Sequence, residues 1–276
     1  MLRGSNLSVV KRVYAIGDIH GRLDLFSDLI AIIARDRAER DPAASRIILL
    51  GDLVDRGPDS AGLVRGCMAL ARTTDRFVVL KGNHEAMMIA ALDGNFVALE
   101  QWLEHGGRET LASFGVAQQL LDDGPGRPLL AAARAMVGGE VFAWLKSLPM
   151  THRHGRHLFV HAGIRPGVRL SRQTEDDLLW ITDEFLSSTV DHGMIVVHGH
   201  SITGTVPDIR PNRVGIDTGA YRSHILTCLA VEKAESWILQ TDPRVPGSLF
   251  EPSASPAGLA EGRAAKSALC EVTSRP

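Results

Sequence analysis

Residues 12–21 read Arg-Val-Tyr-Ala-Ile-Gly-Asp-Ile-His-Gly, an apolar run that ends in a glycine and two residues of metal-ligand type. Such near-continuous apolar character is typical of a buried strand rather than a half-exposed one. Asp18 and His20 lie two positions apart, so in an extended chain their side chains project to the same side. A carboxylate oxygen and an imidazole nitrogen placed in this way can share one metal ion. Alone, the pair fits a loop aspartate that caps the next helix beside a surface histidine better than it fits a metal site.

Further short runs of aliphatic and β-branched residues predict more strands of the same kind. They are Arg46–Gly51, Phe77–Gly82, His157–Ala162, Met194–Gly199, Val214–Asp217, Ile225–Val231 and Trp237–Gln240. Helical patterns at Leu23–Arg40 and Ser60–Arg72 separate the first three strands, which predicts a βαβαβ unit with a parallel core. The last strands are joined by short turns, so part of the sheet should be antiparallel. The fold class is therefore α/β with mixed strand directions.

The chain divides into one main domain and two ends. We place a domain at residues 12–240, preceded by an N-terminal extension at 1–11. Residues of about 86–149 are rich in alanine and leucine and predict a helical insertion rather than a second domain. From residue 241 to 276 the composition turns to Pro, Ser, Ala and Gly, which predicts a disordered tail with little to bury.

Composition narrows the classes of partner. Thirty basic and 32 acidic residues give a net charge of −2, which supplies no global attraction to nucleic acid or to an anionic membrane. The three cysteines are widely spaced and form no CxxC pair, which favours reduced thiols over a disulfide framework. No stretch approaches the roughly 20 apolar residues of a membrane span. We expect a cytoplasmic protein, and the oligomeric state stays open.

The second predicted strand ends in Gly51-Asp52-Leu53-Val54-Asp55-Arg56-Gly57. Asp52 occupies the strand-end position that Asp18 has in the first strand. Its carboxylate has two oxygens and can bridge two cations. Asp55 and Arg56 follow on the loop, where a salt-bridged helix entry is the simpler alternative.

The next three predicted strands end in ligand-type residues as well. The third ends in Gly82-Asn83-His84-Glu85, the fourth in His161 and the fifth in His198-Gly199-His200. Asn83 offers a neutral oxygen ligand and His84 could donate a proton, although the pair could also cap the following helix. Because ligands of open α/β sheets bind at the carboxyl ends of the strands, five such ends in succession favour one shared site.

The candidate ligands form a mixed nitrogen and oxygen set without cysteine, which argues against a structural zinc site. It suits divalent manganese, iron or zinc, and one bridging carboxylate fits two ions about 3.5–4 Å apart. The candidates are Asp18, His20, Asp52, Asn83, His161 and one of His198 or His200.

The strings Gly-Asp-Ile-His-Gly, Gly-Asp-Leu-Val-Asp-Arg-Gly and Gly-Asn-His-Glu, in this order and spacing, resemble the signature of the phosphoprotein phosphatases. These belong to the calcineurin-like metallophosphoesterases. The resemblance is strongest to the small bacterial and phage members, including the symmetrical diadenosine tetraphosphatases. The resemblance implies a β-sandwich flanked by helices. It also implies His200 rather than His198 as ligand, with one ion on Asp18, His20 and bridging Asp52. The other ion would be held by Asp52, Asn83, His161 and His200.

The resemblance further implies catalytic roles. His84 would donate a proton, Asp55 would orient it, and Arg56 would grip phosphate oxygens. We therefore expect a phosphomonoester hydrolase, most simply a serine/threonine-type protein phosphatase that uses a hydroxide between two divalent ions such as Mn²⁺. Its partner would be a phosphorylated protein or a small phosphoester. The alternatives are a symmetrical dinucleoside polyphosphate hydrolase and, from another class, an inactive binding module on the same fold.

One position departs from the family pattern. Bacterial relatives often carry Leu-Trp-Ile-Arg before the fifth strand, whereas this chain reads Leu179-Trp180-Ile181-Thr182. Threonine donates one hydrogen bond but carries no charge. We expect a more open phosphate clamp, unless Arg165 or Arg222 on nearby loops binds the phosphate instead.

Overall fold

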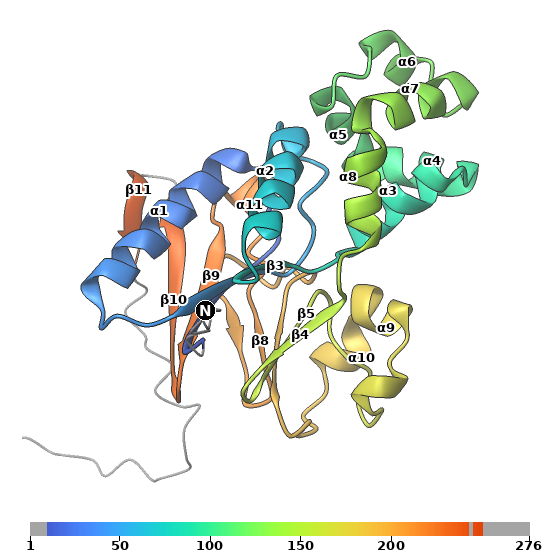
Figure 1. The fold of residues 1–276 in the computed structure, drawn as a ribbon. Helices are drawn as coiled ribbons and strands as arrows, with labels where there is room; N and C mark the ends of the chain where they lie inside the picture. Colours follow the sequence, from blue (N-terminus) through green and yellow to red (C-terminus); the bar gives the residue numbers. More distant parts are fainter. Residues whose placement is uncertain (1–9, 243–244, 251–276) are drawn as a thin grey trace, which may run out of the picture.

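In the computed structural model, which describes residues 10–242 and 245–250, the first three predicted strands lie parallel. They are β1 (Arg12–Ile16), β2 (Ser45–Leu49) and β3 (Phe77–Val79). Helices α1 (Leu23–Glu39) and α2 (Ser60–Thr73) make the two crossovers, as the alternation of apolar and helical patterns predicts (Figure 1).

The register of these strands decides where their loops begin. Ile16 pairs with Leu49, and Leu49 pairs with Val79, so the three strands end level with one another. The loops that follow them, which carry Asp18, Asp52 and Asn83, therefore leave the same edge of the sheet.

The predicted antiparallel part is also present. Strands β9 (Thr227–Glu232), β10 (Glu235–Asp242) and β11 (Val245–Phe250) extend the sheet to the order β11-β10-β9-β1-β2-β3. The end of β10 and the whole of β11 fall in the tail, 241–276, that composition predicts to be disordered, so that prediction is wrong for residues 241–242 and 245–250. Strand β11 forms because β10 offers it hydrogen-bond partners, which local composition does not show. Residues 1–9 and 251–276 lie outside the described part.

A second sheet has the order β4-β5-β6-β8-β7, in which β5, β6 and β8 run parallel. A second set of parallel strand ends is thereby created. The short helices η2 (Leu170–Arg172), α9 (Glu175–Trp180) and α10 (Asp183–Leu186) follow β5. The strands are β4 (Thr151–His154), β5 (His157–Val160), β6 (Ile195–His198), β7 (Asp208–Ile209) and β8 (Arg213–Gly215).

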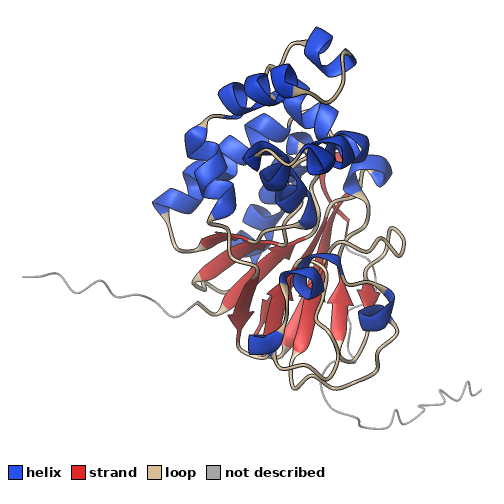
Figure 2. Cartoon of the chain, turned by 90° about the vertical axis from the view of Figure 1, so that its right-hand side faces the viewer, coloured by secondary structure: helices blue, strands red, loops and turns tan. Residues whose placement is uncertain are grey.

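The two sheets pack face to face with helices on both outer sides, which gives the expected β-sandwich (Figure 2). Strand β1 shows why: Val13 and Ala15 face the core between the sheets, while Tyr14 and Ile16 face the helices. All four side chains are fully buried. A strand covered on both faces needs the continuous apolar sequence seen here.

A group of helices fills the chain between β3 and β4, where the sequence predicts an insertion at about 86–149. Figure 1 shows it extending away from the sandwich. No single helix among the described residues is long and apolar enough to cross a membrane; α7 and α8 pass that test only as a pair bent by 86°. The helices are α3 (Asn83–Asp93), α4 (Phe96–Trp102), the π-helix η1 (Leu103–Gly107), α5 (Arg108–Ser113), α6 (Gln118–Asp122), α7 (Arg127–Val137) and α8 (Gly139–Lys146).

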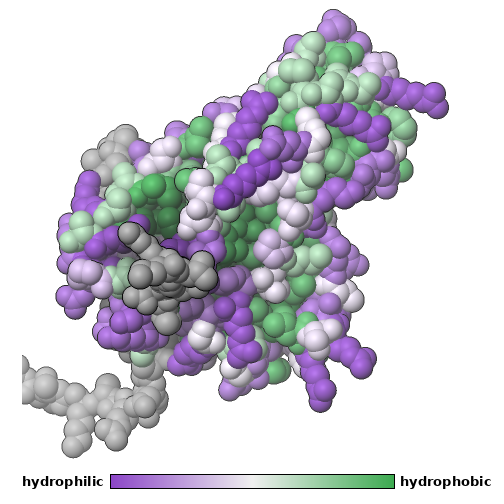
Figure 3. Space-filling model, viewed as in Figure 1, coloured by the Kyte–Doolittle hydropathy of each residue, from purple (hydrophilic) through white to green (hydrophobic). Residues whose placement is uncertain are grey.

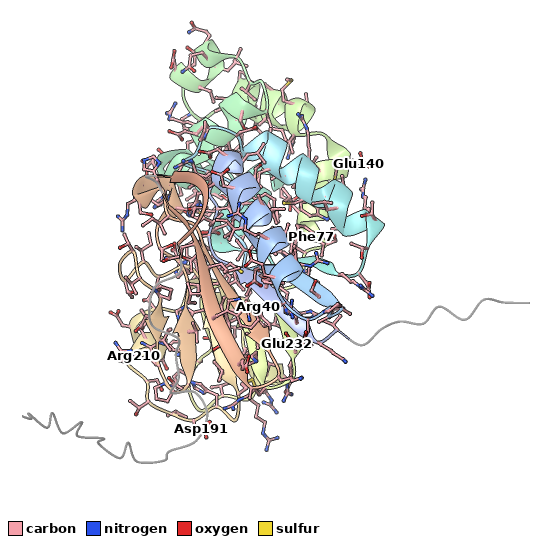
Figure 4. All side chains as sticks on the ribbon, turned by 90° about the vertical axis from the view of Figure 1, so that its left-hand side faces the viewer. Arg40, Phe77, Glu140, Asp191, Arg210 and Glu232 are labelled. Carbon is pink, nitrogen blue, oxygen red and sulfur yellow. The ribbon has the colours of Figure 1, made fainter. Side chains whose placement is uncertain are left out.

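Hydrophobic residues reach the surface in patches on the face shown in Figure 3. A groove of about 570 Å³ lies between α1 and α2 and is lined by Phe26, Ile30, Leu70 and Phe77, the last of which is labelled in Figure 4. Its lining is mainly apolar and includes none of the predicted site residues. The chemistry of this protein therefore has to be sought at the strand ends.

Candidate metal centre

Asp52 lies at the middle of the candidate centre and is almost fully buried. Its Oδ2 lies 3.5 Å from Nε2 of His20, and its Oδ1 lies 3.5 Å from Nε2 of His161. Burial alone would raise the pKa of Asp52, but the surrounding imidazoles outweigh it and lower the pKa. The carboxylate thus stays ionised, with one oxygen facing each side.

The remaining predicted ligands continue this row. Nε2 of His161 lies 2.7 Å from Oδ1 of Asn83, which lies 3.1 Å from Nδ1 of His200. The backbone N–H of His200 donates to Oδ2 of Asp18 at 3.0 Å. The structure therefore brings all six predicted ligands together, from both sheets. These six residues, called the ligand row below, are Asp18, His20, Asp52, Asn83, His161 and His200.

Two groups of three side chains have ligand atoms that all lie within 4.8 Å of one another. One consists of His20, Asp52 and His84, and the other of Asp18, Asp52 and His161. Asp52 belongs to both groups, as a bridging carboxylate must. The grouping differs from the prediction, which placed Asp18 with His20 and Asp52. In the structure Asp18 is grouped with Asp52 and His161, and His84 is grouped with His20 and Asp52.

Hydrogen bonds orient the histidines as metal ligands. Nδ1 of His20 lies 2.8 Å from the carbonyl oxygen of Val54, and Nδ1 of His161 lies 2.9 Å from that of Leu50. Each Nδ1–H can donate to its carbonyl, which leaves the Nε2 lone pair directed at Asp52. Burial lowers the pKa of His20 to about 3 and also lowers that of His161, so both rings are neutral. Neutral, backbone-anchored imidazoles are what a metal ion requires.

Asp18 supplies a second test of the fit to a cation. Its buried Oδ1 has no hydrogen-bond partner among the described residues. Burial, together with repulsion from Asp217 and Asp52, raises its pKa well above the ordinary value. A Cβ atom at Gly199 would lie 2.0 Å from this oxygen, so only glycine leaves room for it. A divalent cation would relieve both the repulsion and the missing contact, so these residues fit a metal.

Asp217 is a site residue that the sequence reasoning missed. It follows β8, is buried, and accepts a hydrogen bond from the N–H of Gly219 at 2.9 Å. Burial raises its pKa to about 6. The signal was present, because Asp217 follows an apolar strand as Asp18 and Asp52 do.

His84 differs from the other histidines of the centre. Its Nδ1 lies 2.6 Å from Oδ2 of Asp55. Burial opposes the charged ring, but the charge of Asp52 and the hydrogen bond that Nδ1–H donates to Asp55 outweigh it, so the pKa of His84 is raised. A ring that favours the protonated form is a poor ligand and a suitable proton donor. The geometry thus supports the predicted role of His84, although the ring lies within ligand distance.

The helical insertion holds the carboxylate of Asp55. Trp102 Nε1 lies 2.9 Å from both carboxylate oxygens of Asp55, and Thr110 Oγ1 donates to Oδ1 at 2.6 Å. The backbone N–H of Asp55 donates to the same hydroxyl at 2.8 Å. Sequence reasoning missed both partners, because nothing near Trp102 or Thr110 in the chain shows that they face Asp55.

Glu85 is a second carboxylate, after Asp217, that the sequence reasoning did not single out. It is fully buried, and its oxygens accept the backbone N–H groups of Gly82, Asp52, Leu53 and Val54 at 2.8–3.2 Å. A buried loop must pair its N–H groups with some acceptor. Glu85 therefore fixes the loop that carries Asp52 against the loop that carries Asn83.

The backbone of the centre is unusual. Seven non-glycine residues in the described part of the chain have positive φ angles, and five of them belong to this site. This conformation costs about 1–3 kcal/mol at a non-glycine residue and clusters at functional sites. The five are His20 (48°), Asp52 (50°), Asp55 (77°), Arg56 (69°) and His200 (61°).

Arg56 reaches the centre and contacts two of its histidines. Its Nη1 lies 2.8 Å from Nε2 of His20 and its Nη2 lies 3.0 Å from Nε2 of His84. The guanidinium carbon lies 4.7 Å from the ring centroid of Tyr221, in the short helix α11 (Ala220–Ser223). Tyr221, which the sequence reasoning did not single out, thus supports the one predicted arginine that reaches the centre.

The other predicted arginines lie differently. Arg165 donates from Nε to Asp177 and from Nη1 to Glu184, each at 2.7 Å, so two of its three guanidinium nitrogens are already paired. Arg222 is exposed, and its guanidinium carbon lies 5.8 Å from the ring of Tyr221, one side chain away from Arg56. The structure therefore brings Arg222 to the rim of the centre and ties Arg165 to acidic residues.

His198 is separate from the row of ligands. Its ring packs edge-on against Phe185 at 5.1 Å, and its Nδ1 lies 3.0 Å from the carbonyl oxygen of Gly199. The geometry thus agrees with the choice of His200 over His198.

A sandwich of two mixed sheets, with overlapping His and Asp ligand groups at their parallel strand ends, is the arrangement of a metallophosphoesterase. Residues 11–226 match the model of the family described as calcineurin-like phosphoesterase. This chain belongs to that family.

Curated relatives are similar over part of the chain. The symmetrical bis(5'-nucleosyl)-tetraphosphatase of Aromatoleum aromaticum is 32% identical over 155 residues, which are 56% of this chain and 45% of the relative. That of Acidovorax sp. is 33% identical over 158 residues, 56% of this chain and 44% of the relative. The chain thus spans about half the length of the curated relatives it matches.

Solved structures show the same fold. A candidate diadenosine tetraphosphatase aligns with a TM-score of 0.57 at 21% identity, over 85% of this chain and 96% of the other. A cold-active protein tyrosine phosphatase aligns with a TM-score of 0.58 at 17% identity, over 88% and 78%.

Proposed function

We propose that this protein hydrolyses symmetrical dinucleoside polyphosphates with the help of two divalent metal ions, manganese being the first to test. The observation that carries the metal chemistry is Asp52, which is shared between two His/Asp groups. The support for the substrate is the activity named for the relatives that are 32–33% identical. This substrate was the alternative to a protein phosphatase in the sequence analysis, and the relatives favour it.

When bound, the two ions would acidify a water molecule and withdraw charge from phosphoryl oxygens. The six ligands of the row would hold them. Arg56, beside His20 and His84, offers two donors to phosphate oxygens. His84, oriented by Asp55, turns Nε2 toward the centre and can pass a proton to the departing oxygen.

A second function has one observation in its favour. The His84–Asp55 pair is arranged to donate a proton, which a poor alkoxide leaving group needs more than a nucleoside diphosphate does. This favours a phosphomonoester such as phosphoserine or phosphothreonine, the main expectation from the sequence.

One assay separates the two. The manganese-loaded protein is given diadenosine tetraphosphate, a phosphoserine peptide and p-nitrophenyl phosphate, and the nucleotide products are separated by chromatography. We expect the diadenosine compound to give the highest kcat/KM, with ADP as the sole nucleotide product. Equal amounts of ATP and AMP would contradict symmetrical cleavage, and a higher kcat/KM for the phosphopeptide would establish the second function.

A further inference from the structure

Trp180, the last residue of α9, is an exposed aromatic side chain beside the metal centre. Its ring centroid lies 6.3 Å from that of His200, with the ring planes at 83°. Nevertheless 42% of the side chain is exposed to solvent. Trp180 therefore lies beside the predicted metal ligand His200 and is still partly open to solvent.

The neighbours of Trp180 show that packing does not require an aromatic residue there. Leu178, Leu179 and Ile181 are 8%, 0% and 8% exposed, and Leu178 and Ile181 pack with Phe185 against the second sheet. Trp180 is thus an exposed aromatic side chain on an anchored segment that also lies beside a predicted metal ligand, where it can contact a molecule bound at the centre.

Tyr221 offers a comparison at the other end of the ligand row. Its ring meets His20 edge-on at 5.4 Å, but the guanidinium of Arg56 lies over its face and that of Arg222 lies 5.8 Å away. Within the part of the chain that the structure describes, no cation lies over the ring of Trp180. Of these two rings, Trp180 is thus the one that is exposed without a cation over it among the described residues.

The charges around Trp180 select the kind of ligand. The next three polar residues are the uncharged Thr182 and the exposed Asp183 and Glu184. None of these three residues carries a positive charge, and Glu184 is paired with Arg165. The segment after Trp180 thus brings no unpaired cation for a phosphate, whereas a neutral, flat nucleobase needs none.

We propose that Trp180 is the stacking surface for a nucleobase of the substrate, whose phosphate chain lies over the His and Asp row. This inference rests on the proposed function, because only a nucleotide substrate has a base to stack. Stacking of one base on an aromatic ring changes affinity by roughly 5- to 150-fold. Trp180 would thus determine specificity for nucleotides over plain phosphate esters.

The test compares Trp180→Leu, which keeps an apolar side chain, with Trp180→Phe, which keeps an aromatic face. Phe96→Leu is the matched control, since Phe96 is 44% exposed at the start of α4 in the insertion. Binding of ADP and of pyrophosphate to the manganese-loaded protein is measured by calorimetry. In parallel, KM is measured for diadenosine tetraphosphate and for p-nitrophenyl phosphate.

We expect Trp180→Leu to weaken ADP binding and raise the KM for the diadenosine compound at least about 5-fold. Pyrophosphate binding and p-nitrophenyl phosphate kinetics should stay unchanged. Trp180→Phe should retain most of the ADP affinity, and Phe96→Leu all of it. Unchanged ADP affinity in Trp180→Leu, or an equal loss for pyrophosphate, would overturn the inference. If the unmodified protein does not cleave the diadenosine compound, the proposed function is wrong, and a selective loss of ADP affinity would still support the base contact.

Discussion

His84 and Asp55 form a buried pair in which Nδ1 of the ring lies 2.6 Å from a carboxylate oxygen. The histidine is the second residue of α3 and the aspartate lies in the loop after β2, while the other donors to the carboxylate come from α4 and α5. The proton donor is thus built jointly by the sheet edge and by the insertion. His84, Asp55 and the residues that hold Asp55 can therefore be tested separately from the metal ligands.

Replacing His84 by asparagine should remove the proton donor and leave the ligand row intact. The loss for an alkyl phosphate should be about 10²–10⁴-fold. It should be smaller for p-nitrophenyl phosphate, whose leaving group needs little protonation. Rates on both substrates check this, and equal losses would count against the role of His84.

Trp102→Phe, a change in the helical insertion, should disturb the His84–Asp55 pair. It removes the indole N–H that lies 2.9 Å from both oxygens of Asp55, a bond worth about 1.5–3 kcal/mol to a charged acceptor. We expect kcat on an alkyl phosphate to fall roughly 10-fold or more, with metal content unchanged. Trp144→Phe, on α8 of the same insertion, is the control and should behave as the unmodified protein. Equal activities of the two variants would show that the insertion does not position the donor.

Asp52→Asn should weaken both ligand groups, because the shared side chain loses its charge and one ligand oxygen. Elemental analysis should find less bound manganese, and activity should fall by orders of magnitude with poor rescue by added metal. Asp75→Asn serves as the control, since that carboxylate is 72% exposed and lies in the turn before β3. Normal metal content in Asp52→Asn would refute the bridging role.

Glu85→Gln should destabilise the fold rather than only the centre. The variant puts an NH₂ group where an oxygen now accepts backbone N–H groups, and each unsatisfied buried group costs about 1–3 kcal/mol. Urea unfolding should show the free energy of unfolding lowered by about 2 kcal/mol or more. Glu140→Gln, in an exposed ion pair with Arg72, should change it little. A Glu85→Gln variant as stable as this control would mean that the loop does not depend on the carboxylate.

Thr182→Arg should strengthen phosphate binding. Thr182 is exposed at the start of α10, its side chain makes no capping bond, and Arg165 is already paired with Asp177 and Glu184. A new charge-assisted contact of about 1.5–3 kcal/mol should lower the KM for p-nitrophenyl phosphate roughly 10-fold or more. Bulkier esters should gain less, and metal content should not change. A KM that is unchanged or higher would show that the clamp is already complete.

Much of the fold was predictable because its central strands are buried on both faces. The apolar run predicted at Arg12–Gly17 is β1 at Arg12–Ile16, and helix Ser60–Arg72 is α2 at Ser60–Thr73. Strand β4 was missed because Thr-His-Arg-His has no apolar run, and an edge strand that is partly exposed needs none. β11 was missed because its stability comes from β10.

The candidate ligands could be predicted for the same reason, since each follows a buried strand. The residues that orient them could not, apart from Asp217. Trp102 and Thr110 lie 47 and 55 residues from Asp55 in the chain, and only the packing of the insertion brings them to it. Nor does any local pattern predict the left-handed backbone at Asp52 or His200, which the surrounding loops impose.

The contact between Asp18 and His200 joins residues 182 positions apart. During synthesis, the first loop is therefore complete long before its counterpart leaves the ribosome. Until then Asp18 and Asp52 are two acidic side chains on a partial sheet, without the second sheet that holds His161. Contacts of such long range form late and slowly in folding. Metal binding should accordingly be one of the last events in maturation, and a bound metal ion would report that both halves have docked.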